Sequence, residues 1–190
     1  MKFDFKEQTA LVTGGTRGIG RAISEAFLKA GAKVIATYRG NDEEAEKFKQ
    51  ANADHMGFLD IHKFDYLIIA CPLNEETKDM INLKLIRNMK KNAIIINVAR
   101  GPIINEADLY IALKNKLIRG AIIDVWYNYP QNGSSKKLYP SKYPLHQLDN
   151  VTLSPHSSAW SHQLWDRRFK FICENLENLY NNRRLKNIVS

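Results

Sequence analysis

The sequence is poor in cysteine: Cys71 and Cys173 are its only two, and they lie far apart without the spacing of metal ligands. This pattern excludes a disulfide-stapled scaffold and favours two buried or partly buried free thiols over a metal site. No apolar run reaches the roughly 18 residues of a membrane span, and the N-terminal stretch "MKFDFKEQTA" lacks the apolar centre of a signal peptide. We therefore expect a cytoplasmic protein without a membrane partner.

Acidic residues are also in the minority, with 20 against 28 Lys and Arg and a net charge of +8. The basic residues are scattered, apart from the cluster "NNRRLK" at 181–186, and no aromatic-interleaved basic stripe accompanies them. This distribution favours a solvated basic surface over a nucleic-acid partner. Attraction of an anionic cofactor is compatible with it.

Six short β-branched, apolar runs recur along the chain: "TALVTG", "AKVIATY", "DYLIIACP", "AIIINVA", "GAIIDVW" and "NVTLSP". Runs that are apolar almost throughout are typical of a parallel sheet covered on both faces. Helical segments are expected between and after them, at 21–30, 42–51, 83–89, 106–114 and 161–181, with a long loop at 127–150. The alternation predicts the α/β class, a doubly wound parallel sheet of the Rossmann type, in a single domain of 190 residues with no separate substrate domain.

The stretch "TGGTRGIG", Thr13–Gly20, lies between the first expected strand and the first expected helix. Glycines at 14, 18 and 20 would let the chain turn off the strand, approach a pyrophosphate and pack the helix on the sheet. The helix N-terminus then presents free N–H groups and the positive end of its dipole to phosphate. A second strand follows at 33–38, which is the context that a dinucleotide-binding loop needs. The expected cofactor-binding residues of the loop are Gly14, Thr16, Arg17, Gly18, Ile19 and Gly20.

The spacing T-G-x-x-x-G-x-G, together with the stretch up to about residue 60, resembles the short-chain dehydrogenase/reductase family. Where an acidic residue would bind the ribose hydroxyls of NAD, this sequence has Tyr38 followed by Arg39. Arg17 and Arg39 together would bind a 2′-phosphate, so NADP(H) is the preferred cofactor and NAD(H) the alternative. The other interpretation is two exposed arginines without a ligand. By the same resemblance, Asp60 would contact the adenine.

That resemblance does not extend to the catalytic residues of the short-chain family. Tyr110 and Lys114 have the tyrosine-to-lysine spacing, but Asn97 occupies the position thirteen residues earlier where the family has a serine. We interpret this pair as a chance feature of a surface helix.

From Phe64 onward, the segments "FDYLIIACPLNEETKDMINLKLIRNMKKNAIIINVARGPIINEADLYIALKNKLIRGAIIDVW" and "LDNVTLSPH" resemble the D-2-hydroxyacid dehydrogenases. The resemblance implies that Arg100 binds the substrate carboxylate and carbonyl, that Asp124 lies near the nicotinamide carboxamide, and that His156 is the catalytic proton donor. Pro72 and Ala99 are counted among its cofactor-binding residues. The structural alternatives are surface ion pairs for Arg100 and Asp124 and a structural role for His156.

Two departures from that family weaken the expected activity. Tyr129 stands where the family has a glutamate, and a phenol that is neutral at pH 7 cannot stabilise an imidazolium by charge, although it can orient the ring. Only twelve residues precede Thr13, whereas the family builds a substrate domain mostly from residues ahead of the glycine loop. Without it, little would hold a substrate in place.

Two resemblances in one chain suggest a fused or engineered protein with a junction near 54–64. The leading hypothesis is a domain that binds NADP(H), or less tightly NAD(H), with oxidoreductase ancestry and little or no turnover. The alternatives are an NADPH-dependent reductase of a small 2-oxo acid using Arg100 and His156, and a folded fusion without cofactor binding. A homodimer, with the loop at 127–150 as a contact, is also expected.

Overall fold

The computed structural model describes residues 3–40, 42–49, 61–130 and 138–186. Asp60 and most of the expected junction lie outside the described residues. The chain divides into two compact units, Met1–His156 and Ser157–Ser190.

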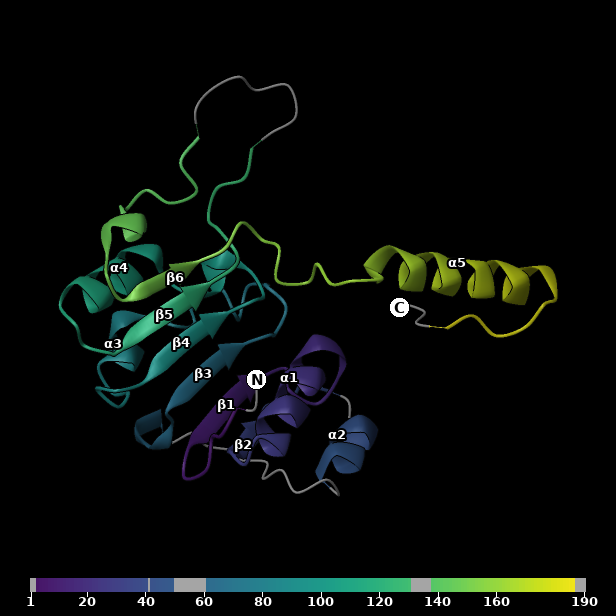
Figure 1. Ribbon diagram of the computed structural model, residues 1–190, viewed down its shortest axis with the longest axis horizontal. Coiled ribbons are helices and arrows are strands. Elements are labelled where there is room, and N and C mark those ends of the chain that lie inside the picture. The colour runs from purple at the N-terminus through teal and green to yellow at the C-terminus, as the bar shows by residue number, and fades with distance from the viewer. Residues whose placement is uncertain (1–2, 41, 50–60, 131–137, 187–190) are drawn as a thin grey trace. The chain divides into compact units, whose positions relative to one another are not determined.

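The first unit is built on one six-stranded sheet in the order β2-β1-β3-β4-β5-β6, with every neighbouring pair parallel (Figure 1). The strands are β1 (Thr9–Thr13), β2 (Lys33–Ala36), β3 (Tyr66–Ile69), β4 (Ile94–Asn97), β5 (Gly120–Ile123) and β6 (Val151–Leu153). All six lie in the apolar runs, so the predicted α/β class and parallel sheet are confirmed.

Successive residues of β1 face opposite sides of the sheet and belong to two different clusters. Ala10 and Val12 pack with Phe27 of the first helix, whereas Leu11 joins the larger cluster on the other face. All three are at most 1% exposed, and burial of each large apolar side chain contributes about 1.5–3 kcal/mol. Burial on both faces is why the parallel strands are apolar almost throughout.

The helices of this unit are α1 (Gly18–Lys29), α2 (Asp42–Lys49), α3 (Leu83–Ile86) and α4 (Glu106–Lys114). Asn82 and Asn105 cap α3 and α4, accepting hydrogen bonds from backbone N–H groups three residues on, at 3.1 Å each. Helix α4 has the predicted bounds, whereas α3 ends at Ile86, three residues earlier than predicted. In the described part of the 127–150 segment, a short 3₁₀ turn covers Leu145–Gln147.

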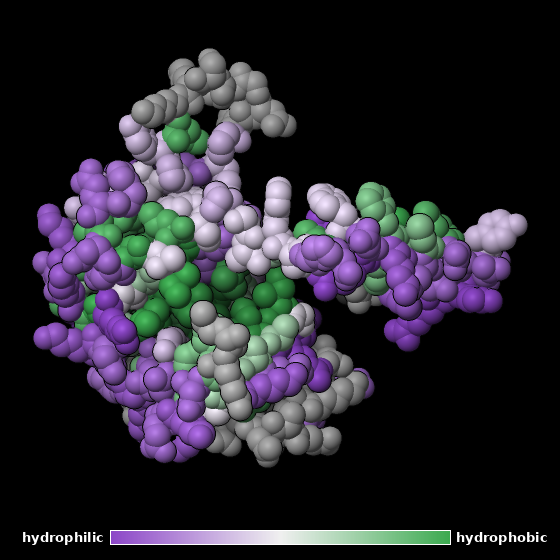
Figure 2. Space-filling view, in the orientation of Figure 1, coloured by the Kyte–Doolittle hydropathy of each residue, from purple (hydrophilic) through white to green (hydrophobic). Residues whose placement is uncertain are grey.

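One face of the sheet is less well covered toward β5 and β6. Ile122 of β5 is 38% exposed and Ile96 of β4 is only partly buried, although the cluster around α1 covers Ile68 of β3. Figure 2 shows apolar side chains gathered on the surface over this part of the sheet.

The second unit contains α5 (Leu164–Tyr180), which has no buried residue. Five large apolar side chains, each 51–61% exposed, form a stripe at alternating spacings of four and three residues: Trp165, Phe169, Ile172, Leu176 and Leu179. Cys173 is exposed, so the expectation that both cysteines are at least partly buried is wrong for Cys173 and holds for Cys71. Among the described residues, no helix has the length and apolar character needed to cross a membrane.

Candidate functional site

The carboxyl ends of all six parallel strands lie along one edge of the sheet. Strand β1 pairs with β2 on one side and with β3 on the other, so the strand order reverses at β1. In open α/β sheets, ligands bind beyond the carboxyl ends of the strands at such a reversal. The glycine loop follows β1 and therefore lies at this point.

The glycine loop leaves no space for a side chain at Gly15 and Gly20. A Cβ on Gly20 would overlap the carbonyl oxygen of Gly14, and one on Gly15 would lie 2.8 Å from the Cβ of Ala36. Gly14 has a φ of +67°, a left-handed conformation that favours glycine. Ser24 of α1 donates a buried hydrogen bond of 3.1 Å to the carbonyl of Gly15. The loop is thus held by close backbone packing, as a phosphate cradle requires.

The N-terminus of α1 is available to an anion. Arg17 occupies the N-cap position without a side-chain capping bond, and the first turn has no acidic residue. No carboxylate in the first turn of α1 therefore competes for the helix N–H groups, which suits the binding of dinucleotide phosphates. Arg17, Gly18 and Ile19 are exposed beside it, whereas the Thr16 side chain is buried.

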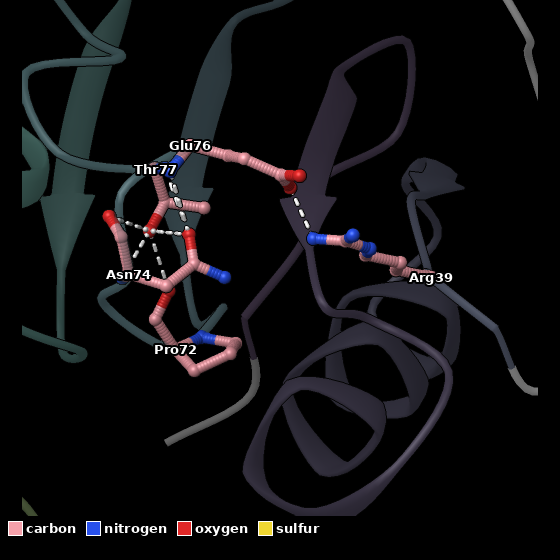
Figure 3. Close-up of polar contacts among 5 residues, drawn as sticks. All are labelled: Arg39, Pro72, Asn74, Glu76 and Thr77. Atoms are coloured by element: carbon pink, nitrogen blue, oxygen red, sulfur yellow. Dashed lines mark hydrogen bonds and ion pairs between the residues drawn. The ribbon is translucent and has the colours of Figure 1, made fainter.

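The segment after β2 carries the residues expected at the cofactor ribose. Tyr38 and Arg39 are both exposed. A hydrogen bond to the Asp42 carboxylate raises the pKa of the Tyr38 hydroxyl, with smaller effects of desolvation and of the Asp42 and Glu46 charges. Arg39 forms an ion pair with Glu76, a residue of the loop after β3 (Figure 3). Arg39 is therefore engaged by a carboxylate rather than left to solvent alone.

The loop after β4 is fixed by Asn97, the last residue of that strand. Its amide donates to the carbonyl of Arg100 at 3.0 Å and its Oδ1 accepts from the N–H of Ala99 at 3.1 Å. Arg100 is exposed and donates to the carbonyl of Ala99 at 2.7 Å. A Cβ on Gly101 would overlap the carbonyl of Trp126, so this loop lies directly against the segment after β5.

Strands β5 and β6 are tied together at their carboxyl ends. Asp124 is buried, and its Oδ1 accepts a hydrogen bond of 2.5 Å from the hydroxyl of Ser154. The indole N–H of Trp126 donates to the carbonyl of Ser154 at 3.0 Å. These bonds set the start of the segment that carries His156.

His156 and Tyr129 meet at this end of the sheet edge. The Tyr129 hydroxyl lies 3.1 Å from Nδ1 of His156 and accepts from the N–H of Trp126 at 2.9 Å. The phenol thus orients the imidazole through Nδ1, and no described residue forms a hydrogen bond with Nε2. His156 has a φ of +56°, and a left-handed residue outside glycine is often found at a functional site.

The structure accordingly groups the expected residues at two places on one edge. The glycine loop, Tyr38 and Arg39 lie at the β1–β2 end, and Pro72 is exposed in the loop after β3. Ala99, Arg100, Asp124, Tyr129 and His156 lie at the β4–β6 end. The ring centroids of Tyr110 and Tyr143 are 5.2 Å apart, and Lys114 lies over the Tyr110 ring. These contacts agree with a packing role for Tyr110 and Lys114.

Sequence reasoning missed four residues that shape these two places: Gly15, Glu76, Asn97 and Ser154. Gly15 stood in the quoted glycine stretch, next to Gly14. Asn97 and Ser154 are polar residues near the carboxyl ends of two of the apolar runs, and that position was the available signal for a site at the strand ends. Nothing in the sequence indicated that Glu76 faces Arg39, 37 positions away.

These features define the class as a dinucleotide-binding domain of the Rossmann type. Residues 1–158 match the family described as "D-isomer specific 2-hydroxyacid dehydrogenase, NAD binding domain". The chain belongs to this family. The match runs through 54–64 without a break, so it supports one family on both sides and gives no support to a short-chain segment, a fusion or an engineered origin.

Curated relatives include a glyoxylate reductase of Korarchaeum cryptofilum, 36% identical over 175 residues, which are 92% of this chain and 49% of the relative. A glyoxylate/hydroxypyruvate reductase B of Serratia proteamaculans is 34% identical over 161 residues, 84% of this chain and 46% of that protein. The chain thus spans about half the length of these relatives.

Solved structures agree with the fold. The NAD-complexed D-isomer specific 2-hydroxyacid dehydrogenase from Lactobacillus delbrueckii ssp. bulgaricus has a TM-score of 0.79 at 26% identity, covering 98% of this chain and 57% of the other. An acyclic imino acid reductase in complex with NADPH and D-Arg has a TM-score of 0.75 at 25% identity, covering 98% and 55%. Relatives of this fold have therefore been solved with either cofactor.

Proposed function

We propose that this chain is the cofactor-binding part of a 2-hydroxyacid dehydrogenase and prefers NADP(H) to NAD(H). The observation that carries the preference is Arg39, which is exposed after β2 at the position where an acidic side chain would bind the ribose hydroxyls of NAD. Arg17 is exposed as well, at the N-cap of α1. Two guanidinium groups suit a 2′-phosphate through charge-assisted hydrogen bonds.

The binding test is an equilibrium titration of the chain with NADPH and NADH, in which binding is measured by fluorescence or calorimetry. We expect tighter binding of NADPH, and an Arg39→Gln variant in which most of the difference between the two cofactors disappears. Flat titrations with both cofactors would falsify cofactor binding and leave a folded domain without a ligand. Equal affinities in the unaltered chain would contradict the preference alone.

A second function rests on the β4–β6 end: reduction of a small 2-oxo acid. The Arg100 guanidinium would pair both oxygens of the substrate carboxylate, and His156 would give the proton on Nε2 to the carbonyl oxygen. The Tyr129 hydroxyl would hold the ring through Nδ1. NADPH, when bound, supplies the hydride that arrives at C2, so the products are the 2-hydroxy acid and NADP⁺.

Glyoxylate and hydroxypyruvate are the first substrates to test, because relatives named for them match this chain. Steady oxidation of NADPH that requires the 2-oxo acid would support the reductase. The other hypothesis, a cofactor-binding domain with little or no turnover by itself, predicts the same titration without NADPH consumption.

We also propose a homodimer. The exposed aromatic side chains Tyr129 and Tyr139, which lie in the long loop between β5 and β6, support a contact there. Light scattering coupled to size exclusion tests this state, and a monomer at every concentration would contradict it.

A further inference from the structure

The ion pair between Arg39 and Glu76 crosses the cofactor edge of the sheet. Arg39 follows β2 and Glu76 follows β3, and these strands lie on the two sides of β1. Strands two positions apart in a sheet are separated by about 10 Å, so the two side chains must reach toward one another over the end of β1. Figure 3 shows them extended in this way. The pair therefore lies beside the glycine loop that follows β1.

Glu76 is held in place by its own loop. The Asn74 side chain accepts hydrogen bonds from the N–H groups of Glu76 at 3.1 Å and Thr77 at 3.0 Å. The Thr77 hydroxyl accepts from the N–H of Asn74 at 2.8 Å and lies 2.8 Å from the carbonyl of Pro72. Because these bonds fix the backbone on both sides, the position of the Glu76 carboxylate opposite Arg39 does not depend on a flexible loop.

The neighbouring Glu75 shows that the arrangement is specific to one carboxylate. Glu75 and Glu76 are both exposed and carry the same charge, but among the residues that the structure describes only Glu76 forms an ion pair with Arg39. The Arg39 and Glu76 side chains are 74% and 64% exposed. Exposed pairs are weak, with interaction free energies that correspond to a change of about one- to fivefold in an equilibrium constant.

We propose that Glu76 is a specificity-determining residue: it is an internal counter-ion for Arg39 that competes with the 2′-phosphate of NADP(H). To bind that phosphate, Arg39 must leave the carboxylate, and the carboxylate then lies near a like charge. NAD(H) has a hydroxyl at this position and does not compete for Arg39. Glu76 thus lowers the preference for NADP(H) that Arg39 creates. This inference rests on the proposed cofactor binding.

The test compares Glu76→Gln with the matched variant Glu75→Gln, which removes the same charge one residue away. Equilibrium titrations of the unaltered chain and both variants with NADPH and NADH give six dissociation constants, and the melting temperatures without ligand check the fold. We expect Glu76→Gln to tighten NADPH binding about two- to fivefold and to change NADH binding by less than about 1.5-fold. Glu75→Gln should change neither the NADPH nor the NADH dissociation constant by more than about 1.5-fold.

A double variant identifies the route of the effect. In Arg39→Gln, adding Glu76→Gln should no longer change the ratio of the NADPH and NADH constants, because the competed partner is gone. An unchanged ratio in Glu76→Gln, or an equal gain in Glu75→Gln, overturns the role of Glu76 while cofactor binding stands. Absence of binding in the unaltered chain overturns both.

Discussion

The two ends of the cofactor edge are built by different means. At the β1 end, the glycine loop is shaped by the lack of side-chain atoms at Gly15 and Gly20, whose neighbours leave no space for a Cβ. At the β4–β6 end, side-chain hydrogen bonds hold the site: Asn97 binds the backbone of the loop after β4, and the Tyr129 hydroxyl binds the His156 ring. The first end should thus be sensitive to added atoms and the second to lost partners.

The sharpest test of this division is His156→Ala. If the β4–β6 end supplies only chemistry, reduction of a 2-oxo acid should fall by about 10²–10⁴-fold, because the proton donor is gone. The dissociation constant for NADPH should stay within about twofold, since surface-type changes away from a site have small effects. His146→Ala, also at an exposed histidine, is the control for both assays. Turnover that survives in His156→Ala would move the proton donor elsewhere.

Gly20→Ala should give the reverse result. The added methyl group must displace the backbone of Gly14, with a cost of about 1–3 kcal/mol in the free energy of unfolding and a loss of at least about tenfold in NADPH affinity. Gly31→Ala is the matched control, because its φ of +92° predicts a similar loss of stability, about 1–2 kcal/mol, at the other end of α1. Denaturant melts and cofactor titrations on both variants separate the two effects. Normal NADPH binding by Gly20→Ala would show that the loop tolerates a side chain at this position.

Asn97→Ala tests whether the β4–β6 end depends on polar partners. The N–H of Ala99 and the carbonyl of Arg100 would lose their partner, with an expected loss of about 1–3 kcal/mol in stability. The displacement of Arg100 should appear as a raised KM for the 2-oxo acid. Asn105→Ala removes the cap of α4, with a loss of about 1 kcal/mol and an unchanged KM. Equal KM values in the two variants would show that Asn97 has no part in positioning Arg100.

The smallest effect is expected at Tyr129. Loss of its hydrogen bond in Tyr129→Phe should slow reduction by about two- to tenfold. In Tyr129→Glu, a carboxylate replaces the phenol and favours the imidazolium, so the alkaline limb of the pH–rate profile should move up by about one pH unit. Profiles that coincide in the two variants would mean that Tyr129 does not act through His156.

The sheet was predictable because its signal is local. A strand buried on both faces is apolar almost throughout, as Ala10, Leu11 and Val12 of β1 show, so six apolar runs identify six strands. The glycine loop is also local, since a turn, a left-handed residue and a helix start follow one another within Thr13–Gly20. The exposure of Cys173 depends instead on which face of α5 is covered, and composition alone does not determine that.

The contacts that complete the site are not local. Gly15 needs to be small because Ala36, 21 positions later, approaches it, and Glu76 meets Arg39 only because β1 lies between β2 and β3. Resemblance located Arg100, Asp124 and His156 as expected residues at the strand ends, but it also suggested a second family for the first 60 residues. A glycine loop is shared by many dinucleotide-binding domains, so its spacing alone did not distinguish between the two families.

Helix α5 has a consequence for the kinetics of its backbone amides. A helix of 17 residues without a buried side chain gains little from packing within its own unit, whereas most helical stability in proteins comes from the packing of an apolar face. Its N–H groups should therefore open by local fraying and exchange with deuterium long before those of β4, which open only with the whole sheet. Slow exchange across Trp165, Phe169 and Ile172 would then report that a surface has covered the apolar stripe.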